Sequence, residues 1–110
     1  MRLLLVENHA VFAEIVSRSF LSAHEVVVAP SLGEARQQLK GGQFGAVLVD
    51  FDLDDGKGDE LVRELASGGF AGRIVAISSH QRGNAALLQA GAHACCPKTR
   101  FDEIAATLEG

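Results

Sequence analysis

Short runs of consecutive apolar residues alternate along the chain with segments in which apolar residues recur every three or four positions. The continuous runs are rich in Val, Ile, Leu and Ala, which is typical of strands buried on both faces of a parallel sheet. They occupy residues 3–6, 26–28, 46–49, 74–77 and 93–96. The pattern therefore predicts five strands.

The segments between these runs have the apolar spacing of amphipathic helices. The first covers about residues 10–21, and Ser31 with Glu34 predicts a capping box at the start of the second. Gly41-Gly42 ends that second helix. The other helices are expected at about residues 61–67, 85–90 and 99–108.

Strict alternation of strand and helix requires right-handed crossovers and a parallel sheet covered on both faces. For five strands, the flavodoxin-like α/β order 2-1-3-4-5 is the leading choice. The length of 110 residues predicts a single domain, residues 1–110. Its ligand site should lie at the carboxyl ends of the strands, where the first and third strands are neighbours.

Composition excludes several classes of protein. The hydrophobic content of 47% and charged content of 22% are ordinary for a globular domain, and the net charge of −4 does not favour nucleic-acid binding. No apolar run reaches the roughly 20 residues of a membrane span, and the amino terminus lacks a signal-peptide core. Cys95 and Cys96 are adjacent, so they predict neither a disulfide nor a zinc site. We expect a cytoplasmic protein.

Carboxylates are concentrated at the end of the third predicted strand. Asp50 directly follows the apolar run, and Asp52, Asp54 and Asp55 come within the next five positions. Such a group of acids is repulsive unless a cation, a lysine or water lies between them. The predicted topology supplies the neighbours, because it places residues 7–8 beside Asp50.

Four strand ends then carry polar residues that face one crevice: Glu7 and Asn8, Asp50, Ser78, and Lys98. With this set in order along the whole chain, the sequence resembles the receiver domain of two-component response regulators. Residues 4–9 resemble the usual opening of that family, and residues 50–58 resemble its acceptor loop.

The resemblance implies that Asp50 accepts a phosphoryl group from a histidine kinase or a phosphotransfer protein. It further implies a Mg²⁺ ion held by Asp50, by Glu7 through water, by the amide oxygen of Asn8 and by the backbone carbonyl of Asp52.

Two further catalytic roles are implied. Lys98 would pair with the acceptor carboxylate and Ser78 would hydrogen-bond the phosphoryl group, switching contacts with an output domain or a receiver dimer. Such a protein is a signalling module rather than an enzyme, with self-catalysed phosphorylation and dephosphorylation at most.

Three positions depart from the family pattern. Asn8 stands where an acid normally binds the metal, Asp54 where a proline is usual, and Cys95 where an aromatic switch residue is usual. A receiver-like docking module that works without phosphorylation is therefore the alternative function. Ala85, Leu88 and Cys95 form either an exposed apolar patch for a partner or dimer, or part of the core.

Other interpretations are less favoured. Residues 50–52 resemble the motif of haloacid-dehalogenase-type phosphatases, but those enzymes carry it on their first strand and are longer. A flavodoxin-type cofactor site would need aromatic residues and a phosphate-binding loop after the first strand. His9 and His80 are expected at the surface, and Ser78, like its neighbours, is available to cap the next helix. The sequence leaves open a stand-alone receiver or part of a larger regulator.

Overall fold

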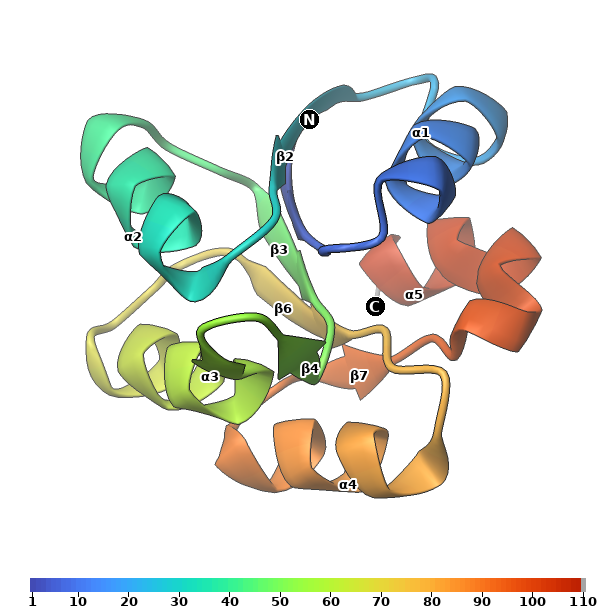
Figure 1. Cartoon of the computed structure of the whole chain (residues 1–110). Helices are drawn as coiled ribbons and strands as arrows, with labels where there is room; N and C mark the ends of the chain where they lie inside the picture. Colours follow the sequence, from blue (N-terminus) through green and yellow to red (C-terminus); the bar gives the residue numbers. More distant parts are fainter. Residues whose placement is uncertain (110) are drawn as a thin grey trace.

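A parallel sheet forms the centre of the computed structural model, which describes residues 1–109 (Figure 1). Its strands lie in the order β2-β1-β3-β6-β7 and all pair in parallel. They are β1 (Arg2–Val6), β2 (Glu25–Ala29), β3 (Ala46–Val49), β6 (Arg73–Ala76) and β7 (Ala94–Cys95). Counting only these strands, the order is 2-1-3-4-5, so the predicted flavodoxin-like topology is confirmed.

Helices cover both faces of the sheet (Figure 1). On one face lie α1 (Ala10–Ser19), the 3₁₀ helix η1 (Lys98–Glu103) and α5 (Ile104–Glu109); on the other lie α2 (Leu32–Gly41), α3 (Gly58–Ser67) and α4 (Gln81–Ala90). Because side chains alternate along a strand, Leu3 and Leu5 of β1 pack toward α1 and α5, whereas Leu4 and Val6 pack toward the other helices. None of the helices in residues 1–109 combines the length and apolar character needed to cross a bilayer.

Several element boundaries differ from the sequence prediction. The helix α1 ends earlier than expected. The amides of Phe20 and Leu21 both donate to the carbonyl of Val16, at 2.9 and 3.0 Å, so the i→i−4 pattern does not continue at Leu21. The last helical segment begins as a 3₁₀ helix with Arg100 outside helical geometry. Strand β2 is longer than predicted and β7 is shorter.

The start of α2 is capped from a distant loop. Ser31 Oγ accepts from the Glu34 amide at 3.2 Å, but the reciprocal bond of a capping box is not found in the described part of the chain. Instead the Asp55 carboxylate accepts from the amides of Leu32 and Gly33, at 2.8 and 2.9 Å. The predicted capping box is therefore only half formed, and α2 is tied to the loop that follows Asp50.

That loop contains a small antiparallel hairpin that the sequence pattern did not reveal: β4 (Asp52–Leu53) pairs with β5 (Gly56–Lys57). The hairpin leads directly into α3, whose first residue, Gly58, donates its amide to the Phe51 carbonyl at 2.7 Å. A methyl group on Gly58 would overlap the Asp50 carbonyl oxygen and lie 2.9 Å from Val49 Cγ1. Close approach of α3 to the end of β3 therefore requires glycine here.

The apolar patch on α4 and β7 lies at the surface. Ala85, Leu88 and Cys95 are exposed, Leu88 by 40%, so the alternative that they belong to the core is wrong. They border a hollow of about 430 Å³ that Gln81 and Pro97 also line.

Replacing Gly58 tests the close packing of α3. We expect Gly58→Ala to lower the free energy of unfolding by about 1–3 kcal/mol, because the methyl group meets backbone that has no room to move. Denaturant unfolding measures this loss. The matched control is Gly41→Ala, where a methyl group meets nothing within 4 Å; this change should leave stability equal or raise it by up to about 1 kcal/mol. Equal stabilities of the two variants would contradict this account.

Candidate functional site

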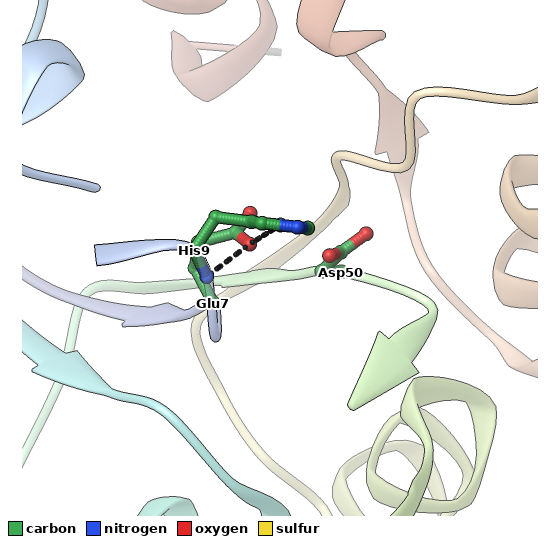
Figure 2. A group of neighbouring side chains, drawn as sticks. All are labelled: Glu7, His9 and Asp50. Atoms are coloured by element: carbon green, nitrogen blue, oxygen red, sulfur yellow. Dashed lines mark hydrogen bonds and ion pairs between the residues drawn. The ribbon is translucent and has the colours of Figure 1, made fainter. Parts of the chain in front are cut away.

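The carboxyl ends of β1 and β3 bring two carboxylates together. Val6 pairs with Val49, and the Asp50 amide donates to the Val6 carbonyl at 3.0 Å, so the next residues, Glu7 and Asp50, lie side by side (Figure 2). Both are buried, with exposed fractions of 1% and 5%. The predicted juxtaposition of these acids at the switch point of the sheet is present in the structure.

Lys98 lies between the two carboxylates. Its Nζ is 3.1 Å from Asp50 Oδ2, to which it donates a hydrogen bond, and 2.7 Å from Glu7 Oε1. The contact with Glu7 is an ion pair, and Lys98 is the partner of the buried Glu7 Oε1. The ammonium also lies 4.8 Å from the centre of the Phe12 ring. One buried positive charge therefore opposes two buried negative charges.

Burial raises the pKa of Asp50, and the negative charge of Glu7 raises it further. The hydrogen bond and positive charge of Lys98 and the hydrogen bond from the Phe51 amide counter this rise only in part. Desolvation and a like charge both disfavour the ionised carboxylate. The protein consequently holds Asp50 in an environment that would favour an added cation.

The side chain of Asn8 is fixed in one orientation by Asp54. Asn8 Nδ2 donates to Asp54 Oδ1 at 3.1 Å, while Asn8 Oδ1 is buried and has no hydrogen-bond partner within residues 1–109. A flipped amide would place its oxygen against the Asp54 carboxylate, so the hydrogen bond determines which amide atom is free. Asn8 Oδ1 is thus an unpartnered oxygen acceptor next to the Glu7 carboxylate, and oxygen ligands are those that Mg²⁺ requires.

Ser78 is held at the end of β6 by a residue that the sequence interpretation did not single out. Asn84 accepts from the Ser78 amide at 2.8 Å and donates to the Ser78 carbonyl at 3.0 Å. The His80 amide donates to Ser78 Oγ at 3.3 Å, and His80 Nδ1 caps α4 by accepting from Gly83 at 3.0 Å. His80, rather than Ser78, is therefore the N-cap. An Asn near a helix start is a signal for such local backbone bonds.

The Asp52 side chain points away from the pair of buried acids. It is exposed and bonds Lys57 on the facing strand of the hairpin and His80 Nε2, the latter at 3.2 Å. The hydrogen bond from Lys57 is the main reason that the pKa of Asp52 lies below its usual value, and the hydrogen bond with His80 is the second. The role predicted for Asp52 uses its backbone carbonyl, and it remains a prediction.

His9 takes part in the cluster although its ring is 70% exposed. The His9 amide donates to Glu7 Oε2 at 3.0 Å, and Nδ1 of the ring lies 3.1 Å from the same oxygen (Figure 2). One potential ligand atom from each of Glu7, His9 and Asp50 lies within 4.8 Å of the others. The sequence interpretation expected His9 at the surface and did not foresee its contact with Glu7. The contact is possible because His9 follows Glu7 by two residues.

The raised pKa of Asp50 predicts that ionisation of this side chain costs stability. We expect Asp50→Asn, studied without divalent ions, to stabilise the fold at pH 7 by on the order of 1 kcal/mol, or a few degrees in the unfolding midpoint. The gain should disappear below about pH 4, where Asp50 is protonated in both folded and unfolded chains.

Thermal unfolding as a function of pH measures this difference. Asp52→Asn serves as the matched control, because the lowered pKa of Asp52 predicts a small loss of stability at pH 7 instead of a gain. A destabilised Asp50→Asn variant at pH 7 would contradict the electrostatic account.

The chain is similar to known proteins in sequence. A sequence model of the response regulator receiver domain matches residues 3–109. The transcriptional regulatory protein CitB of Klebsiella pneumoniae is 35% identical over 79 residues, which are 69% of this chain and 34% of that protein. The chain therefore spans about a third of the length of this curated relative.

Solved structures agree in fold. The response regulator protein TrrA from Thermotoga maritima, in complex with Mg²⁺-BeF, superposes with a TM-score of 0.87 at 19% identity, over 98% of this chain and 96% of that one. A response regulator protein from Burkholderia pseudomallei, with a phosphorylated aspartic acid, a calcium ion and citrate, gives 0.85 at 22% identity, over 97% of this chain and 65% of that one. The family match over nearly the whole length, on this fold, identifies the chain as a member of the response regulator receiver domain family of two-component signalling.

Proposed function

We propose that this receiver domain accepts a phosphoryl group on Asp50 from a histidine kinase or a phosphotransfer protein, in a reaction that requires Mg²⁺. The observation that carries the proposal is the buried cluster in which Lys98 lies 3.1 Å from Asp50 and 2.7 Å from Glu7. A structural ion pair with Lys98 would need only one acid. Here a second buried acid, Glu7, raises the energy of the ionised Asp50 carboxylate. That excess negative charge supports a site prepared for a cation.

The proposed transfer is a nucleophilic substitution at phosphorus. An Asp50 carboxylate oxygen forms the new bond to phosphorus, and the bond from phosphorus to the nitrogen of the donor histidine breaks, so that the imidazole leaves. A divalent ion supplies positive charge that offsets the repulsion between the carboxylate and the phosphoryl oxygens. Lys98, already paired with Asp50, is in position to bind a phosphoryl oxygen once the carboxylate has become an acyl phosphate.

The residues present fit a hard divalent cation. Glu7 and Asp50 provide carboxylate oxygens, and Asn8 provides the amide oxygen that Asp54 leaves free. In the proposal, Asp52 contributes its backbone carbonyl. Because an amide carries no charge, we expect the affinity for Mg²⁺ to be lower than that of a site with a third carboxylate.

The loop after β6 would transmit the signal. In the proposal, the Ser78 hydroxyl turns to the phosphoryl group, which alters the contacts of the loop and the patch of Ala85, Leu88 and Cys95 behind it. That patch would bind an output domain or a second receiver.

A receiver-like docking module that needs no phosphorylation is the second candidate. The observation that favours it is the contact of Lys98 with both carboxylates. Lys98 already neutralises part of the negative charge of Glu7 and Asp50, and Asn8 adds no negative charge that would attract a metal ion. Such a module would bind its partner equally well with or without a modified Asp50. Self-catalysed reaction with a small phosphodonor separates the two candidates.

We expect incubation with acetyl phosphate and Mg²⁺ to add the mass of one phosphoryl group, and EDTA to prevent the addition. Intact-protein mass spectrometry measures the adduct. Asp50→Asn should abolish it, because the amide is not a nucleophile of this kind. The control Asp55→Asn should retain it, since the Asp55 side chain is bonded to the start of α2. Absence of any adduct at high Mg²⁺ and donor would exclude the first candidate and favour the docking module.

The neutral residue in the site gives a second prediction. Asn8→Asp adds a third carboxylate, so we expect the affinity for Mg²⁺ to rise by on the order of tenfold, measured by titration calorimetry. Without metal, the same variant should be less stable, because the new charge faces Asp54. Adding Asp54→Asn to the variant should restore part of that stability. Unchanged affinity for Mg²⁺ would show that residue 8 does not contact the ion.

A further inference from the structure

The His9 ring has a defined position but no structural role in its own helix. His9 is the N-cap residue of α1, yet its side chain makes no capping hydrogen bond. Figure 2 shows the ring extending across Glu7 toward Asp50. The Glu7 carboxylate fixes this placement, because one of its oxygens contacts both the His9 amide and the ring Nδ1.

The spacing of the three side chains is that of metal ligands. Their candidate ligand atoms lie within 4.8 Å of one another. Around a six-coordinate ion with bonds of about 2.1 Å, neighbouring ligands are about 3.0 Å apart and opposite ones about 4.2 Å apart. The distance of 3.1 Å between His9 Nδ1 and Glu7 Oε2 corresponds to two neighbouring ligands. A separate observation also indicates a cation, namely the buried Asn8 Oδ1 beside Glu7, which has no hydrogen-bond partner among the described residues.

We propose that His9 is a nitrogen ligand of the divalent ion beside Asp50, and that the site therefore prefers Mn²⁺ and other first-row transition ions to Mg²⁺. This inference rests on the proposed function, since it concerns the identity of the ion in the same site. It assigns a ligand role to His9, which the sequence interpretation expected to be a surface residue without a function.

The chemistry of the ligand set supports this preference. Mg²⁺ selects charged oxygen ligands and retains its waters, whereas imidazole nitrogen suits transition ions. This site offers two carboxylates, one neutral amide and a nearby ammonium, so it attracts Mg²⁺ less strongly than a site with three carboxylates would. A nitrogen ligand adds coordination energy when the ion is a first-row transition ion such as Mn²⁺, but contributes little when it is Mg²⁺.

The test compares the affinities of the whole chain for Mn²⁺ and Mg²⁺, measured by titration calorimetry, in the wild type and in His9→Gln. Glutamine keeps a donor for Glu7 but replaces nitrogen by a neutral oxygen. We expect the affinity for Mn²⁺ to fall by on the order of tenfold and that for Mg²⁺ to change less than about twofold. His24→Ala is the matched control: this imidazole contacts the chain amino terminus, so neither affinity should change.

A spectroscopic measurement makes the test independent of affinity. Pulsed electron paramagnetic resonance of bound Mn²⁺ should detect imidazole nitrogen in the wild type and lose that coupling in His9→Gln. Metal-free thermal unfolding checks that the variant is folded. If both ions bind but His9→Gln changes neither the affinity ratio nor the nitrogen coupling, the ligand role of His9 is wrong while the phosphoacceptor proposal stands. If neither ion binds the wild type, both proposals fail.

Discussion

The interaction on which the site depends is the contact of the Lys98 ammonium with the carboxylates of Glu7 and Asp50. One cation opposes two buried anions, so the arrangement remains short of positive charge. Burial of a charge is costly unless it is fully compensated. The protein maintains this imbalance because five paired strands hold the backbone of Glu7 and Asp50 in place. An added divalent ion, or a phosphoryl group accompanied by one, would complete the compensation.

The segments around this cluster are held to different extents: the acceptor loop is fixed by buried packing and helix capping, and the loop of Ser78 contacts it through an exposed hydrogen bond. Asp55 ties the acceptor loop to the start of α2, and the absence of a side chain at Gly58 lets α3 pack against the end of β3. The loop of Ser78, by contrast, is connected to the acceptor hairpin by the exposed contact between His80 and Asp52. Exposed contacts of this kind contribute little energy. In the proposed function, this loop is the part that a modification of Asp50 would rearrange.

Several site residues were predictable for a simple reason: an apolar strand that ends in a polar residue places that residue at the carboxyl edge of the sheet. Glu7, Asp50 and Lys98 follow this rule, and the structure brings them into contact. His9 and Asn84 do not follow it. His9 contacts Glu7 through a turn within one loop, and Asn84 reaches back to Ser78 from inside α4. Neither contact leaves a periodic signal, because both depend on how a loop folds onto its own helix.

The sequence by itself determined the order of strands and helices, the parallel sheet and the edge at which the polar residues gather. These follow from hydrophobic periodicity and the handedness of crossovers, which are local or nearly so. Only the tertiary structure decided which acid faces which partner. Asp50 joins Lys98, Asp52 joins Lys57, Asp54 joins Asn8 and Asp55 caps α2. Four carboxylates within six residues look equivalent along the chain. They acquire different roles because their partners, one from the hairpin itself and the others from distant segments, lie in different directions around it.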